Sequence, residues 1–178
     1  ASFDDGDSDG SGGTFDELNG AYAITTVVIG SNTYALVASS VDDGVQIIDI
    51  TTPGSPTATA SFEDGGSDGS GGTFDELNGA YGITTVVIGS NTYALVASAL
   101  DDGVQIIDIT TPGSPTATAS FDDGDSDGSG GTFDELNGAR GITTVVIGSN
   151  TYALVAAYDD NGVQIIDITT PGSPTATA

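Results

Sequence analysis

The chain consists of three near-identical copies of a 59-residue sequence, which begin at Ala1, Ala60 and Ala119. Repeats of this length fold as single structural units that bury their apolar surfaces against neighbouring copies. A unit of this size is only marginally stable on its own, because it buries a smaller fraction of its surface than a larger domain does. We therefore expect three repeats that share a continuous core, at residues 1–59, 60–118 and 119–178.

Each copy carries the pattern of four short strands. In the first copy, the segments rich in β-branched and apolar residues are 24–29, 34–38, 45–50 and 57–62. Gly, Asn, Asp and Pro residues typical of turns separate them, at 30–32, 42–44 and 53–56. No segment shows a sustained helical period, and the first two strands are apolar on both faces, which indicates sheets covered on both sides. We expect an all-β chain of stacked four-stranded antiparallel sheets, the blades of a β-propeller.

A family resemblance supports this fold. Residues 34–38, a short acidic turn, residues 44–50, and then Pro53 and Pro56 resemble the LVIVD repeat of bacterial and archaeal surface proteins. The resemblance recurs in all three copies and covers about half of each. It implies a propeller blade in an exported protein, with no enzymatic activity attached to the repeat itself.

Composition restricts the possible partners. The formal net charge is −25, and Arg140 is the only basic residue, so we expect no binding to nucleic acid or to anionic membranes. The chain has no Cys and no His, which leaves carboxylate, hydroxyl and amide oxygens for chemistry. We expect no insertion into a membrane, since no apolar run is long enough, and no leader directly before Ala1; the absence of Met predicts a processed product or an excerpt. Such acidity suits a salty, extracellular or cell-surface setting.

A long, Gly-rich acidic loop lies between Phe3 and Ala21. Ordering it is unfavourable, because fixing the backbone of each residue costs about 1–2 kcal/mol of conformational entropy. We expect it either to be disordered or to be organised by Ca²⁺. Counted from Asp5 as position 1, the Asp, Gly and Ser residues fall at positions 3, 5, 6, 7 and 12 of an EF-hand-type loop. The predicted Ca²⁺ ligands are Asp5, Asp7, Asp9, Ser11, Asp16 and Glu17; Asp64, Asp68, Ser70, Asp75 and Glu76; and Asp123, Asp125, Asp127, Ser129, Asp134 and Glu135.

The loop departs from an EF-hand in two respects. Position 12 is Asp16 rather than a bidentate Glu, so Glu17 is expected to contribute, and no helices flank the loop. In this it resembles the Asp-x-Asp-x-Asp-Gly sites of integrin-type propellers. In the middle copy Gly66 stands where the other copies have Asp, so we expect weaker binding there, with Glu63 or water recruited. The alternative is a solvated, flexible linker.

An enzyme is not expected, because the chain offers no activated nucleophile and three equivalent copies argue against one unique active site. Binding is the stronger alternative, because exposed Tyr side chains can stack on sugars. Differences between the copies concentrate at two sets of equivalent positions, Tyr22, Tyr81 and Arg140, and Ser40, Ala99 and Tyr158. The candidate ligand-binding residues are Tyr22, Tyr81, Arg140 and Tyr158, and simple packing at the start of a strand is the other interpretation.

Three blades are too few to close a ring, since propellers close with about four to eight. The ring needs further blades or a partner chain. We expect residues 175–178 to form a strand that Ser2 and Phe3 would continue, so two chains could complete each other as a closed six-bladed dimer; otherwise we expect an open array that forms a fibre. We expect an extracellular, calcium-stabilised repeat protein with a structural, self-assembling role in a surface layer or fibre. The alternative is an adhesin or carbohydrate-binding propeller.

Overall fold

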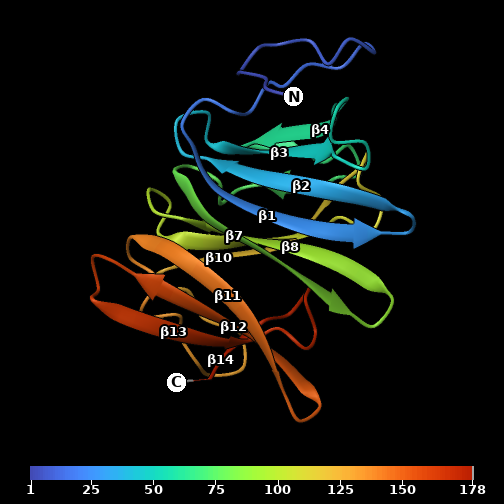
Figure 1. Cartoon of the computed structure of the whole chain (residues 1–178). Helices are drawn as coiled ribbons and strands as arrows, with labels where there is room; N and C mark the ends of the chain where they lie inside the picture. The colour runs from blue at the N-terminus through green and yellow to red at the C-terminus, as the bar shows by residue number, and fades with distance from the viewer. Residues whose placement is uncertain (178) are drawn as a thin grey trace.

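The computed structural model describes residues 1–177 and contains three four-stranded antiparallel sheets, here called blades 1, 2 and 3 (Figure 1). Blade 1 consists of β1 (Ala21–Ile29), β2 (Asn32–Ser39), β3 (Gly44–Asp49) and β4 (Thr57–Glu63). Blade 2 consists of β7 (Ala80–Ile88), β8 (Asn91–Ser98), β9 (Gly103–Asp108) and β10 (Thr116–Asp122). Blade 3 consists of β11 (Ala139–Ile147), β12 (Asn150–Ala157), β13 (Gly162–Asp167) and β14 (Thr175–Ala176). The prediction of an all-β chain is confirmed, since residues 1–177 contain no helix.

The turns follow from residues that tolerate positive φ. Ile29 pairs with Asn32, so a two-residue turn joins β1 and β2, and Gly30 adopts a φ of 63° at its first position. Between β2 and β3, Asp43 has a φ of 55°. Asp and Asn are the residues that most readily adopt this conformation after Gly.

The sheets do not start and end with the sequence repeats. Ala60 lies inside β4 and pairs with Ile47 of β3. Ala119 lies inside β10 in the same way and pairs with Ile106. Each of these sheets therefore takes part of its last strand from the following copy of the sequence.

Two apolar layers join the three blades. The first strands of neighbouring blades are in contact, β1 with β7 and β7 with β11, and Figure 1 shows the sheets stacked in chain order. The first layer includes Leu36, Val45 and Ile47 from blade 1, and Ile83, Val96 and Ile107 from blade 2. The second layer includes Leu95, Val104 and Ile106 from blade 2, and Ala153, Val155 and Ile166 from blade 3. Blade 2 is thus covered on both faces, as predicted, whereas the described residues leave blades 1 and 3 each with one face that meets no other blade.

Across residues 1–177, no helix has the length and apolar character needed to span a bilayer.

Candidate functional site

The acidic loop before the first strand of each blade is folded as a small hairpin. In the middle copy it contains β5 (Gly66–Ser67) paired with β6 (Thr73–Phe74). In the outer copies single bridges take this place, between Ser8 and Thr14 and between Ser126 and Thr132. Hydrogen bonds within the protein therefore order a loop for which the sequence predicts either disorder or organisation by Ca²⁺.

One carboxylate in each loop holds this hairpin together. Asp9 Oδ1 accepts hydrogen bonds from the N–H groups of Ser11 at 2.7 Å and Gly13 at 2.9 Å. Asp9 Oδ2 accepts one from the N–H of Ala58, in β4, at 3.2 Å. These bonds, that from Ser11 above all, hold the pKa of Asp9 below its usual range. The equivalent bonds in the other copies are made by Asp68 and Asp127.

A buried amide connects the end of the loop to the sheet. Gln46 Oε1 accepts hydrogen bonds from the N–H groups of Asp16 at 2.9 Å and Glu17 at 3.3 Å. Gln46 Nε2 donates to the carbonyl oxygen of Ala60, in β4, at 2.8 Å. The side chain is fully buried, so each of these bonds replaces water that cannot reach the site. Gln105 makes the same set of bonds in blade 2.

The side chain of Glu17, at the end of the same loop, is buried and has one oxygen without a hydrogen-bond partner among the described residues. Glu17 is 8% exposed, and its Oε2 forms no hydrogen bond with the described residues; Oε2 of Glu76 is likewise unpaired. Burial, followed by the charges of Asp42, Glu63 and Asp5, raises the pKa of Glu17 to about 8. Burial of a carboxyl group among negative charges costs least free energy when the group keeps its proton or when a cation lies beside it.

The predicted calcium ligands therefore have different positions and roles. Asp5 Oδ1 accepts a hydrogen bond from the N–H of Leu18, and Asp7 Oδ2 accepts one from Asp4. Asp9 is fully engaged with backbone N–H groups. Within residues 1–177, no group of three or more acidic side chains is placed to hold one ion together. Calcium binding by these residues stays a prediction.

Two contributors to this region were missed by the sequence analysis. Gln46 was one, although a lone polar residue in the middle of an apolar strand was an available signal. The sequence predicts a hairpin turn at Asp42, with a separate metal site as the weaker alternative, and not a contact with the acidic loop. Asp42 Oδ2 accepts a hydrogen bond from the N–H of Asn19 at 2.7 Å, and its charge lies near Glu17. Only the fold brings this turn to the acidic loop.

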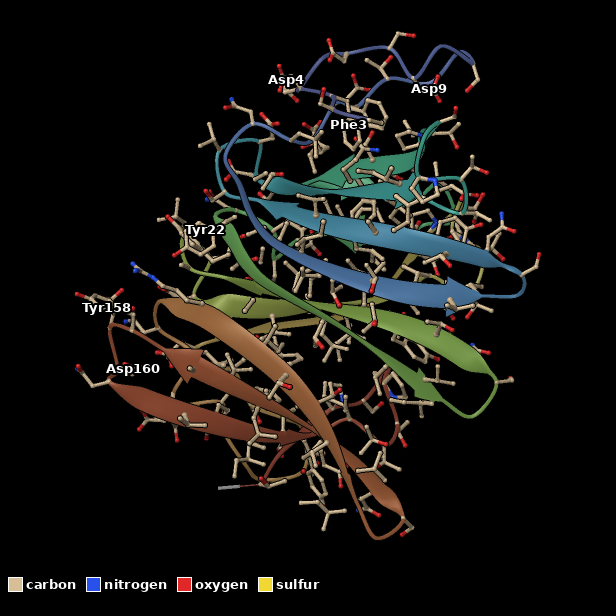
Figure 2. The ribbon with its side chains drawn as sticks, in the orientation of Figure 1. Phe3, Asp4, Asp9, Tyr22, Tyr158 and Asp160 are labelled. Atoms are coloured by element: carbon tan, nitrogen blue, oxygen red, sulfur yellow. The ribbon has the colours of Figure 1, made fainter. Side chains whose placement is uncertain are left out.

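The four candidate ligand-binding residues lie in one row across the blades. The Tyr22 and Tyr81 rings meet edge to face, with centroids 4.6 Å apart. The Arg140 guanidinium carbon lies 5.3 Å from the Tyr81 ring centroid and 4.4 Å from that of Tyr158. Tyr22 and Tyr158 are 63% and 65% exposed, and Figure 2 shows them on the same side of the molecule. The row is both packed, through cation–π contacts, and accessible.

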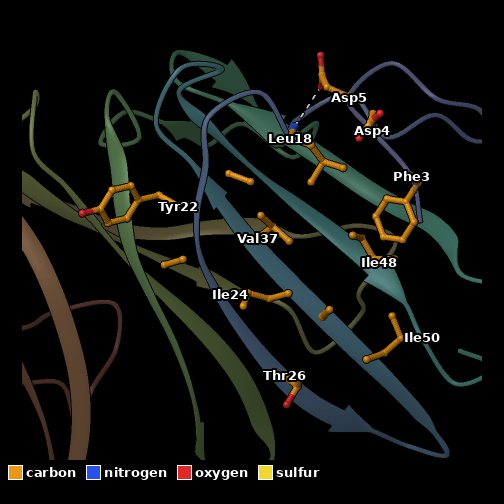
Figure 3. A pocket seen from close by; sticks show the side chains of 13 residues that line it. Phe3, Asp4, Asp5, Leu18, Tyr22, Ile24, Thr26, Val37, Ile48 and Ile50 are labelled. Carbon is orange, nitrogen blue, oxygen red and sulfur yellow. Dashed lines mark hydrogen bonds between the residues drawn. The ribbon is translucent and has the colours of Figure 1, made fainter. Parts of the chain in front are cut away.

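The open face of blade 1 carries an apolar groove of about 540 Å³ (Figure 3). Ile24, Val37 and Ile48 contribute to its wall, and Asp4 and Asp5 lie at the same groove. In blade 2 the equivalent surface is covered by blade 1. The groove of blade 1 is therefore the surface on which a preceding blade would pack.

The open face of blade 3 is the opposite half of the same contact. Val163 and Ile165 are 55% and 39% exposed, whereas the equivalent Val104 and Ile106 of blade 2 are almost completely buried against blade 3. The structure thus presents both halves of its internal interface to solvent, one on each outer blade.

Comparison with known proteins agrees with this architecture. The profile of the LVIVD repeat matches residues 25–64, 82–123 and 141–177. No relative was found among proteins of curated function.

Among solved structures, a functionally unknown protein from Desulfotomaculum acetoxidans DSM 771 is similar, with a TM-score of 0.58 and 19% identity over 89% of this chain and 41% of that one. An exo-β-1,3-galactanase from Clostridium thermocellum has a TM-score of 0.55 and 10% identity, over 86% and 34% of the two chains. An exo-β-1,3-galactanase from Phanerochaete chrysosporium, solved with β-1,3-galactotriose, has a TM-score of 0.54 and 15% identity, over 100% and 40%. The chain thus spans well under half the length of each of these proteins, and the likeness is one of fold.

Proposed function

Because the chain belongs to the LVIVD repeat family, we propose that it is a non-enzymatic structural module that assembles with further blades outside the cell. The observation that carries this proposal is the pair of open faces on blades 1 and 3. They repeat the two halves of an interface that is closed twice within the chain.

The energetics favour covering these faces. Burying a Val or Ile side chain completely stabilises a protein by about 1.5–3 kcal/mol, and Ile24, Val163 and Ile165 are all partly exposed. Contiguous apolar patches of this kind usually mark a contact surface. Repulsion between chains of net charge −25 opposes non-specific aggregation. Because salt or bound cations reduce this repulsion, assembly should depend on them.

Calcium is the cation that we propose for the acidic loops. Each loop offers only hard oxygen ligands. The unpaired carboxyl of Glu17, with Asp5 and Asp42 nearby, gains most from a neighbouring positive charge. A bound ion would offset repulsion among these side chains and fix each loop on its blade.

The assembly proposal is tested by light scattering and negative-stain electron microscopy of the purified chain, in millimolar Ca²⁺ and in excess chelator. We expect particles larger than one chain that loosen when Ca²⁺ is removed. A chain that stays monomeric at high concentration in both conditions would contradict the structural role. Assemblies that ignore the chelator would remove calcium from the proposal and leave the assembly in place.

Glycan binding is a second candidate function, favoured by the exposed row of Tyr22, Tyr81, Arg140 and Tyr158. Tyrosine rings can stack on a sugar, and the guanidinium can donate to its hydroxyl groups. The galactanase structures make β-1,3-galactotriose a sensible first ligand. Calorimetry should show saturable binding that Tyr158→Ala weakens. Tyr93→Phe is the control and should leave binding intact, because Tyr93 packs against the layer between blades 2 and 3 and is not part of the row. No saturable binding to this or to arrayed glycans would exclude the role.

A further inference from the structure

The contact between blades contains a hydrogen bond as well as an apolar layer. Asp43 Oδ1, in the turn between β2 and β3, accepts a hydrogen bond from the N–H of Gly79 at 2.7 Å. Asp102 Oδ1 accepts one from Gly138, again at 2.7 Å. Both Asp residues have positive φ, at 55° and 58°. Each contact between blades therefore joins this turn to the glycine that precedes the next first strand.

Both halves of this hydrogen bond are also present, unjoined, on the outer blades. Asn161 takes the place of Asp43 and Asp102, with the same φ of 58°. Its side-chain carbonyl keeps the oxygen that accepts the bond, without the negative charge. At the other end, Gly20 is partly exposed whereas Gly79 and Gly138 are buried. No hydrogen bond joins the N–H of Gly20 to any residue within 1–177.

The apolar halves show the same relation. Ile24 on blade 1 is 67% exposed, but its equivalent Ile83 is 8% exposed beneath blade 1. Leu154, Ala156 and Val163 on blade 3 correspond to Leu95, Ala97 and Val104, which are fully buried beneath the next blade. The face of blade 3 and the groove of blade 1 thus correspond to the two sides of the contact that joins neighbouring blades.

The aromatic row points to the same pairing. Tyr22 of blade 1 contacts Tyr81 of blade 2, which contacts Arg140 of blade 3. If blade 1 of a second copy followed blade 3, the residue next to Arg140 in this row would be Tyr22 of that second copy. Arg140 is the only basic residue of the chain, and the groove beside Tyr22 carries Asp4 and Asp5.

We propose that blade 3 of one copy docks on blade 1 of a second copy of this chain, with Asn161 accepting a hydrogen bond from Gly20 and Arg140 contacting Tyr22 of the second copy. The contact repeats the one between blades 2 and 3, so its geometry is already realised within the chain. It rests on the proposed assembly function and specifies its partner and its direction. Two different surfaces meet, so the association is head to tail.

Two single variants test this direction, because each blocks only one of the faces. Val163→Asp places a charge on the blade 3 face, and Ile24→Asp places one in the blade 1 groove; both positions are exposed in the single chain, so folding should survive, as circular dichroism would verify. Burying an unpaired carboxylate should raise the dissociation constant at least about 100-fold. Each variant alone is expected to be monomeric by light scattering, and a 1:1 mixture is expected to give a dimer that grows no further, because one competent face of each kind remains.

The matched control is Val146→Asp. Val146 is 63% exposed, and its equivalent in the middle blade, Val87, remains 60% exposed with both contacts formed. This variant should assemble like the wild type. A second pair examines the hydrogen bond: Asn161→Gly keeps the positive φ and removes the acceptor, and should weaken association about 3- to 10-fold, whereas Asn161→Asp should not weaken it.

The outcomes separate the two proposals. A wild-type chain that never associates contradicts the assembly function as a whole. A wild-type chain that associates, with either face variant unaffected or with the mixture still monomeric, overturns the head-to-tail contact and leaves assembly by another surface. A face variant that dimerises alone would show a symmetric contact and would overturn the inference as well.

Discussion

The carboxylate of Asp9 accepts a hydrogen bond from the backbone N–H of Ala58, 49 residues further along the chain. This bond ties the acidic loop at the start of blade 1 to the last strand of the same blade. The loop is therefore fixed to the sheet that follows it in the chain. Asp68 and Asp127 repeat the arrangement with Ala117 and Ala176.

Replacing Asp68 by Asn should lower the melting temperature. The carboxylate now accepts hydrogen bonds from backbone N–H groups on both of its oxygens. In the Asn variant the amide NH₂ would replace one oxygen and would face a backbone N–H group, so two donors would meet. Because the pKa of Asp68 is held below its usual value, its contribution is present at neutral pH and is lost as the pH falls through that lowered pKa. Calorimetric melting at pH 7 in chelator measures the effect, with the neighbouring exposed carboxylate variant Asp75→Asn as the control; equal melting of the two variants would contradict this role.

Gln105→Leu should destabilise the chain by about 2–4 kcal/mol, because it leaves the N–H groups of Asp75 and Glu76 and the carbonyl of Ala119 without their partner. Urea unfolding followed by circular dichroism gives the free energy. A loss below about 1 kcal/mol would mean that water takes over these bonds.

Stability should fall as the pH rises from about 5 to about 8. Burial, followed by the charges of Asp101 and Asp122, raises the pKa of Glu76 to about 8. At pH values between the ordinary pKa of Glu and about 8, the carboxyl of Glu76 keeps its proton in the folded chain and has lost it in the unfolded chain. Its contribution to the free energy of unfolding is therefore present at low pH and disappears as the pH passes 8.

Glu76→Gln should flatten this dependence, which is at most about 1.4 kcal/mol per pH unit for each such group. Urea unfolding in chelator across this pH range measures it. Asp75→Asn is the control that should retain the wild-type slope. An unchanged slope in Glu76→Gln would assign the pH dependence to other groups.

Gly103→Ala should cost about 1–3 kcal/mol. An added Cβ would clash with Glu76 Oε2 and would stand 2.8 Å from the carbonyl oxygen of Phe121. Gly113→Ala is the matched control, since nothing lies within 4 Å of its Cβ position. If thermal melting ranks the two variants equally, the close approach of Glu76 and of the Phe121 carbonyl to Gly103 is contradicted.

Calcium titration should distinguish the middle loop from the outer two. Gly66 replaces an Asp there, so the loop has one carboxylate fewer and should release its ion first on dilution of calcium. Asp125→Gly should bring the third loop to the same weak affinity. Calorimetry that reports three indistinguishable sites in the wild type would contradict the ligand assignment.

The strands were predictable because their residues are strongly patterned. Residues 24–29 are β-branched and stop at Gly30, and both features appear at the end of β1. The start of β1 at Ala21 was not predictable, because Ala21 and Ala23 carry no strand preference and join the sheet through an irregular pairing with β2.

The candidate site was predictable only where equivalent positions in the copies become neighbours. Tyr22, Tyr81 and Arg140 occupy one repeat position, and stacking the blades places them in a row. The order of the acidic loop could not be read from spacing, because it depends on Asp9 reaching Ala58 in a distant strand. The position of Asp42 beside Glu17 likewise depends on how a turn packs against the loop.

The offset between sequence copies and sheets has an evolutionary consequence. Each copy boundary falls inside a strand, at Ala60 in β4 and Ala119 in β10. Residues 57–59 and 116–118 are identical, and residues 60–63 and 119–122 differ only at Glu63 and Asp122, so an in-frame duplication or deletion of one copy joins half-strands that fit each other and leaves every remaining sheet with its usual neighbours. We therefore expect chains with one copy more or one copy fewer to fold into the same kind of sheet, because every new junction would repeat a junction that this chain already contains.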